Sequence, residues 1–158
     1  DSRFFAHMEE IDLCWRFHTA GYKIGFVPES VVYHVGGGSL PYNSPRKTYL
    51  NFRNSLYLLY RNLPRKRLKM IIFSRLVLDG IAAMFFLLKG ELKNVKAIWK
   101  SHIGFYRILP ELRSERKESD EAMKEKIYSS LLNKSIVFEF YIKRKKTFTD
   151  IISPKAVQ

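Results

Sequence analysis

Three carboxylates lie close together near the beginning of the chain. Glu9, Glu10 and Asp12 fall within one turn of any helix that contains them. Clustered carboxylates repel one another, and such repulsion is one way in which enzymes obtain a general base near neutral pH. Acids in the first turn of a helix also balance the helix dipole without any chemical role. The cluster by itself leaves both interpretations open.

The segment around these acids has the pattern of a short helix. Ile11, Cys14 and Trp15 recur near helical spacing, and Gly21 suits the left-handed residue that ends many helices. We therefore predict a helix over residues 10–20, with Cys14 as a small buried residue. Trp15 on the apolar face is either a core residue or a platform on which a sugar ring stacks.

Two short strands are predicted after this helix. Residues 22–27 and 31–35 are rich in β-branched and aromatic side chains, and Pro28-Glu29-Ser30 forms a turn between them. His34 closes the second strand, where it is either a metal ligand or an ordinary rim residue. Glycines in residues 36–39 allow a phosphate cradle or a hinge; because phosphate-loop spacing is absent, we favour a hinge.

The middle of the chain is predicted to be helical. Apolar residues recur at three- and four-residue steps over 44–107, with an interruption at Pro64. Residues 70–88 are apolar enough to span a bilayer, but each of two central charges, Arg75 and Asp79, costs roughly 2.5–3.5 kcal/mol on insertion scales. We therefore predict that this helix lies on a membrane surface, or on protein, and does not span.

Charge and cysteine content narrow the classes of partner. Lys and Arg number 28 against 15 Asp and Glu, a net charge of +13 that attracts nucleic acid, anionic lipid or phosphorylated substrates. The basic residues flank apolar helices and form no recognised nucleic-acid motif, so no nucleic-acid partner is predicted. Cys14 is the single cysteine, which excludes an internal disulfide and a cysteine-based zinc site. Residues 109–158 form a charged tail without identifiable chemistry.

An ordered series of short motifs resembles a known enzyme family. The motifs are Glu9-Glu10, Asp12-Leu13-Cys14-Trp15-Arg16, Ala20-Gly21-Tyr22, Phe26-Val27-Pro28, Val32-Tyr33-His34 and Gly36-Gly37-Gly38-Ser39. Their order resembles the carboxyl half of the catalytic domain of glycosyltransferase family 2, in its rhamnosyltransferase-like branch of bacterial surface-polysaccharide synthesis. The resemblance covers about residues 4–64.

This resemblance implies a fold class and a domain organisation. The expected class is α/β, with residues 1–64 as part of a GT-A (nucleotide-diphospho-sugar transferase) domain that lacks its amino-terminal half. A mainly helical, basic, membrane-associating region is expected over 65–108, followed by the charged helical tail at 109–158. The chain begins at Asp1 without a leader, from which we expect a missing amino-terminal portion.

The resemblance also implies roles for individual residues. Glu10 is the expected base, Glu9 lies beside it where the family usually has Glu-Asp, and Asp12 has a supporting role. His34 is the expected ligand of a divalent cation, Mg or Mn, whose acidic Asp-x-Asp ligands this chain lacks. Expected substrate-binding residues are Trp15, Arg16, Lys47, Arg53 and Asn54.

The implied activity is an inverting, metal-assisted transfer of a sugar. The donor is a nucleotide-activated sugar, and the acceptor is a glycan or, as the apolar and basic region favours, a lipid-linked saccharide. The expected location is cytoplasmic, peripheral on the anionic inner face of the cell membrane. These residues alone are expected to be inactive, because the metal ligands are absent. The alternative is a non-catalytic, helical module that binds a membrane surface or a partner protein.

Overall fold

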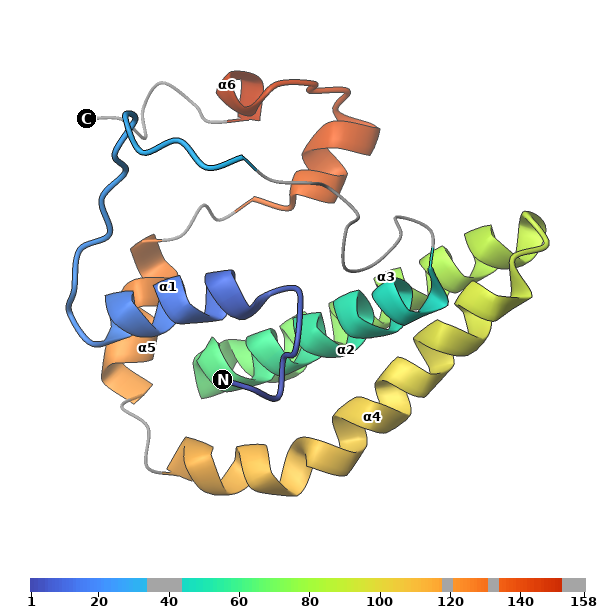
Figure 1. The fold of residues 1–158 in the computed structure, drawn as a ribbon, viewed down its shortest axis with the longest axis horizontal. Helices are drawn as coiled ribbons and strands as arrows, with labels where there is room; N and C mark the ends of the chain where they lie inside the picture. The colour runs from blue at the N-terminus through green and yellow to red at the C-terminus, as the bar shows by residue number, and fades with distance from the viewer. Residues whose placement is uncertain (34–43, 118–120, 131–133, 152–158) are drawn as a thin grey trace.

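The computed structural model describes residues 1–33, 44–117, 121–130 and 134–151. Every regular element in these residues is helical, and α2, α3 and α4 pack against one another while α1 lies beside α2 (Figure 1). The elements are α1 (Glu9–Thr19), α2 (Pro45–Asn62), α3 (Arg65–Leu88), α4 (Leu92–Lys117), α5 (Glu121–Ser130), a π-helical turn η1 (Phe138–Ile142) and α6 (Phe148–Ile151).

The predicted α/β class is wrong for the described part of the chain. Residues 22–27 and 31–33 form no strand, and residues 34–35 of the second predicted strand lie outside the described residues. A strand needs a neighbour to accept and donate its backbone hydrogen bonds, and no described segment provides one. Phe26 and Val32 are accordingly 87% and 84% exposed. The expectation of a GT-A domain over residues 1–64 is therefore corrected to a helical arrangement.

The helix predictions are confirmed. The first predicted helix, over 10–20, is observed as α1, and Gly21 follows it with a φ of 86°, in the left-handed region that favours glycine. Pro64 separates α2 from α3, as expected for a residue that lacks a backbone N–H. Ser44 caps α2, because its side chain accepts a hydrogen bond from the backbone N–H of Lys47 at 3.2 Å.

The core is centred on α2. Phe4 stacks on Tyr57 with ring centroids 4.5 Å apart, and Tyr60 meets Phe105 of α4 edge to face at 6.0 Å. The fully buried apolar cluster consists of Phe4, Leu56, Tyr57, Leu58, Phe105 and Leu112. Because Phe4 belongs to this cluster, the segment before α1 is tied to the central helix.

The two central charges of α3, Arg75 and Asp79, point inward. Arg75 contacts Asp79 with 2.7 Å between Nε and Oδ1, and His102 of α4 contacts the other oxygen of Asp79 at 3.0 Å. Asp79 is only 1% exposed, so this polar group lies between α3 and its neighbours. Neither charge therefore interrupts the outer side of α3.

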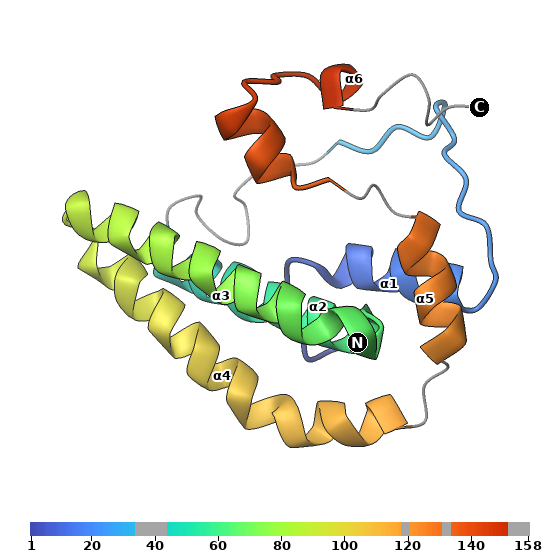
Figure 2. The ribbon, with the colours of Figure 1, turned by 180° about the vertical axis from the view of Figure 1, so that it is seen from behind.

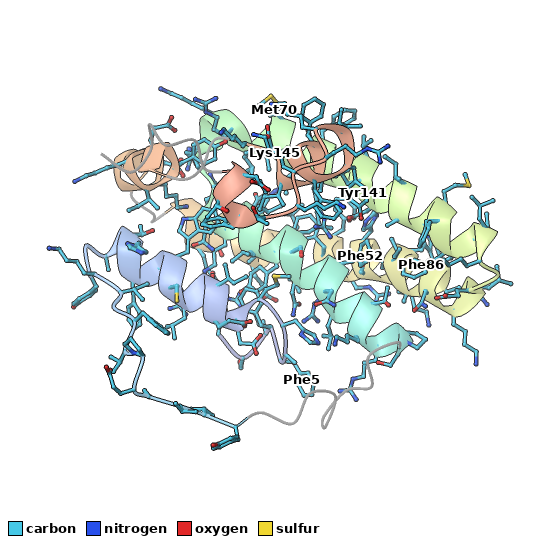
Figure 3. The ribbon with its side chains drawn as sticks, turned by 90° about the horizontal axis from the view of Figure 1, so that it is seen from above. Phe5, Phe52, Met70, Phe86, Tyr141 and Lys145 are labelled. Carbon is cyan, nitrogen blue, oxygen red and sulfur yellow. The ribbon has the colours of Figure 1, made fainter. Side chains whose placement is uncertain are left out.

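The outer side of α3 is apolar and exposed. Its exposed apolar residues are Met70, Phe73, Val77, Leu78, Ile81, Met84, Phe85, Leu87 and Leu88. Met70 lies at the outer edge of the molecule in Figure 3. Within the described ranges, α3 is the one helix that is long and apolar enough to cross a membrane, by length and composition alone. Seen from behind in Figure 2, α3 and α4 run antiparallel and are joined by a tight turn at one end.

Candidate functional site

The candidate site is the first turn of α1, and a segment clamped by α2 leads into it. Asn54 is fully buried, and its side-chain amide donates to the backbone carbonyls of Phe4, Ala6 and His7 at 2.9, 2.8 and 2.9 Å. Buried carbonyls that lack a partner are costly, so these bonds stabilise the path of the segment. The position of α1 therefore depends on one amide of α2.

The clamped segment has an unusual backbone. Phe5, His7 and Met8 have φ values of 64°, 70° and 74°, which place three non-glycine residues in the left-handed region. Each such residue costs on the order of 1–3 kcal/mol and persists only where its surroundings hold it. Arg53 adds to the hold, since its guanidinium donates to the carbonyl of Arg3 at 2.7 Å. Strain of this kind is common where a side chain must be presented at a defined place.

Asp12 anchors α1 on α2. It is fully buried, and its oxygens accept hydrogen bonds from Arg16 Nε at 2.7 Å and from Asn62 Nδ2 at 2.9 Å. Arg61 adds a second positive charge near Asp12, with 3.7 Å between Nη1 and Oδ2. Because both oxygens are occupied, Asp12 is placed to hold the helix and has no free oxygen for a substrate.

Glu9 and Glu10 are placed differently. Both are exposed in the first turn of α1, and neither forms an ion pair or a side-chain hydrogen bond with another described residue. A carboxylate that serves as a base must reach the hydroxyl whose proton it takes, and such exposure permits that. The assignment of Glu10 as the base stays a prediction.

The predicted substrate-binding residues do not form one group in the structure. Trp15 is half-buried against the core, and its indole N–H is buried without a hydrogen-bond partner in the described part of the chain. Arg16 is paired with Asp12 on the same helix, whereas Arg53 and Asn54 face the segment before α1. Lys47 lies in the first turn of α2. Their roles in substrate binding stay predictions.

The prediction that Cys14 is buried is wrong. Its thiol belongs to an exposed residue of α1, because the side of the helix that packs on the core carries Trp15 and Asp12.

The described residues by themselves do not fit a divalent cation. Among them, no group of three or more His, Cys, Asp or Glu side chains could hold a metal ion. Asp12 is occupied by Arg16 and Asn62, which leaves only the exposed pair Glu9 and Glu10 near the start of α1. His34 and the glycine-rich residues 36–39 lie outside the described residues. The cation stays a prediction, and no catalytic step is derived through it.

The described residues line two cavities that the sequence patterns did not predict. One, of about 490 Å³, lies between the start of α2 and the start of α4, and it is lined by Pro45, Arg46, Tyr49, Lys93, Lys96, Ala97 and Lys100. A second, of about 260 Å³, is lined by Arg16, Thr19, Ala20, Arg61, Asn62, Leu112, Glu115, Arg116 and Lys124. Lys93, Lys96 and Lys100 share one face of a helix, and this spacing is the sequence signal from which the first cavity could have been predicted.

The second cavity has unusual electrostatics. Burial lowers the pKa of Lys124 to about 8, and the nearby charge of Arg116 adds to the effect. Burial also lowers the pKa of Arg116, which donates to the carbonyl of Leu63 at 2.5 Å and so ties α4 to the end of α2. A hydrogen bond from Arg3 lowers the pKa of Glu115, which also lines this cavity.

Comparison with known proteins gives no relative for this chain. No protein-family model matches it, and no curated protein or solved structure is significantly similar to it.

Proposed function

We propose that this chain belongs to a glycosyltransferase and presents the base that activates the acceptor hydroxyl. The observation that carries the proposal is the separation of the acids on α1: Asp12 is buried and paired, whereas Glu10, in the same helix, is exposed and unpaired among the described residues. The resemblance of residues 9–39 to motifs of glycosyltransferase family 2 supplies the class of reaction.

In the proposed reaction, Glu10 takes the proton of an acceptor hydroxyl as its oxygen attacks the anomeric carbon of a nucleotide-activated sugar. The new carbon–oxygen bond forms on the face opposite the breaking bond to phosphate, and the nucleoside diphosphate leaves with that electron pair. A positioned base contributes roughly 10²–10⁴-fold to the rate. The clamp by Asn54 and the anchor at Asp12 hold Glu10 in place. The described residues supply no donor site, so we propose that the 158 residues alone do not transfer sugar.

The acceptor in this proposal is lipid-linked, at the inner face of a membrane. Support comes from the exposed apolar side of α3 and from four exposed cations at its start, Arg65, Lys66, Arg67 and Lys69. An anionic leaflet attracts such a cluster by about 1 kcal/mol for each basic residue.

Glu10→Gln tests the catalytic part, in the protein that carries this chain. The substitution keeps size and hydrogen bonding but removes the base, so transfer of labelled sugar should fall roughly 10²–10⁴-fold. Glu9→Gln is the matched control, since Glu9 is also an exposed acid of the first turn, and it should keep most activity. Equal activity in the two variants would remove Glu10 from the role of base.

A second candidate function is a non-catalytic module that binds membranes, favoured by the same exposed side of α3. Both candidates predict flotation with phosphatidylglycerol vesicles, so flotation tests the membrane face and sugar transfer separates the candidates. Replacing Phe73 and Ile81 by Ser should abolish flotation, whereas the same change at the exposed Val31 and Val32 should not. Flotation by a protein that transfers no sugar under any donor tested favours the module, and equal flotation of both double variants contradicts the membrane face.

A further inference from the structure

The cavity between α2 and α4 is rich in cations that have no acidic partner. Arg46, Lys93, Lys96 and Lys100 line it, and no acidic residue does. None of the four forms an ion pair in the described residues, whereas Asp1, Asp12 and Glu115 are paired with arginines. Like charges gathered in one place repel, so the cluster is electrostatically unfavourable until an anion binds.

The cations come from two helix starts that also lack acids. Neither α2 nor α4 has an acidic residue in its first turn, although negative charge there would balance the helix dipole. Lys93, Lys96 and Lys100 are spaced by three and four residues, which places them on one side of α4 facing Arg46 across the cavity. Glu91 directly precedes α4 and offsets the dipole of that helix, so it is the dipole of α2 that adds to the positive potential of the cluster.

The walls of the cavity are held in place by specific contacts. The hydroxyl of Thr48 in α2 donates to the side-chain oxygen of Asn94 at 2.9 Å. The side-chain amide of Asn94 in turn donates at 2.6 Å to the carboxylate of Glu91, the acidic residue nearest in sequence to Lys93. A side chain at Gly104 would meet the hydroxyl of Tyr49 at 2.6 Å, so glycine there allows the tyrosine to pack on α4. The two helix starts are thus joined beside the cavity.

The size and the lining of the cavity indicate the chemical class of its ligand. A volume of about 490 Å³ is far larger than one inorganic anion and falls in the range of sites for organic ligands, about 300–1,000 Å³. Pro45, Ala97 and the ring of Tyr49 contribute apolar lining, and lysine stems are apolar below their charged ends. Such a lining suits an anionic group attached to an apolar body.

We propose that this cavity binds the phosphate group of a lipid, with the cations around the phosphate and the apolar lining against the adjoining chain. The α4 wall directly follows the turn at Gly90, which joins it to the exposed apolar end of α3 at Leu88. A membrane contact through α3 therefore brings the cavity near the headgroup layer. Arg46 also packs over the ring of Phe5, with 4.9 Å from Cζ to the ring centroid.

The choice of a lipid as the source of the phosphate rests on the proposed membrane contact, but the binding site does not rest on sugar transfer. A soluble lipid probe therefore tests the binding site without a membrane and without sugar transfer. Dihexanoyl phosphatidic acid, kept below its micelle concentration, is titrated calorimetrically into the 158-residue chain. Dihexanoyl phosphatidylcholine, inorganic pyrophosphate and uridine diphosphate are titrated in parallel.

The expected result is binding of the phosphatidic acid that Lys96→Gln/Lys100→Gln weakens by about tenfold or more, since charge-assisted hydrogen bonds are lost. The matched control is Arg107→Gln/Arg113→Gln, which removes the same charge from exposed positions of the same helix outside the cavity. It should change the affinity by less than about threefold. Unchanged circular dichroism shows that both variants fold, and Lys93→Glu, at another exposed position of the wall, repeats the test if the double variant does not.

Three results overturn the inference. Equal weakening by the two double variants shows attraction by net charge alone. Absence of phosphatidic acid binding, or equal binding of the phosphatidylcholine, excludes a phosphate site. Pyrophosphate or uridine diphosphate binding at least as tightly as the lipid, with the same dependence on Lys96 and Lys100, excludes a lipid as the source of the phosphate. None of these titrations measures sugar transfer. Their results can therefore be interpreted even if the proposed glycosyltransferase activity is not found.

Discussion

Replacing Asp12 with Asn removes one buried charge while keeping the size of the side chain. The bond to Asn62 is buried, so its loss costs roughly 1.5–3 kcal/mol, as for other hydrogen bonds to charged groups. The bond to Arg16 is worth about 1 kcal/mol or less, because the arginine side chain is 38% exposed. The side-chain NH2 of the new asparagine also faces one of the two donors, Arg16 or Asn62, with no acceptor between them. We expect the free energy of unfolding to fall by about 2–4 kcal/mol.

Urea unfolding, followed by far-ultraviolet circular dichroism, measures this difference. Glu10→Gln is the control on the same helix, and because Glu10 is exposed and unpaired among the described residues it should change stability by less than about 0.5 kcal/mol. A double-mutant cycle with Asn62→Ala should give a coupling of roughly 1 kcal/mol or more, since the two side chains are in contact. Equal stability of Asp12→Asn and Glu10→Gln would refute the assignment of Asp12 as the anchor of α1.

Two further predictions concern buried polar groups. Asn54→Ala removes the donor of the Ala6 and His7 carbonyls, whereas the Phe4 carbonyl keeps the N–H of Ala6 and the guanidinium of Arg53. The substitution should cost roughly 2–3 kcal/mol, with faster amide exchange over residues 5–12, whereas Asn51→Ala on the same helix should do neither. The pKa of Lys124 is about 8 in the folded chain and 10.5 unfolded, so the unfolded state binds more protons and stability rises as pH increases between these values. Lys124→Met should remove that rise and stabilise the chain at pH 7, because the variant no longer buries a charge. Thermal unfolding across this pH range with an unchanged slope in the variant would contradict the prediction.

The helices were largely predictable because their signals are local. Pro64 lacks a backbone donor and lies at the boundary between α2 and α3, although Pro110 is accommodated inside α4. Gly21 adopts a left-handed conformation without a Cβ penalty. The acids of α1 also fall where helix dipoles favour them. Such preferences act within a few residues and do not depend on what lies across the molecule.

The strands were not predictable in the same way. The β-branched and aromatic residues of 22–33 have strand propensity, but propensity becomes a strand only beside a partner that completes the hydrogen bonds. In the described residues no such partner is present, and these side chains are exposed. The α/β prediction failed for this reason.

The sequence by itself determined the local elements and the chemistry that is available: helices divided by proline and glycine, a cluster of acids, and a large excess of cations. Only the tertiary structure decided which of these groups are free. Asp12 and Asp79 are buried with partners from other elements or from one turn away, while Glu10 and the cations of the α2–α4 cavity stay accessible. The physical reason is that burial and pairing depend on contacts between residues far apart in the chain, such as Asp12 with Asn62, which spacing along the sequence does not specify.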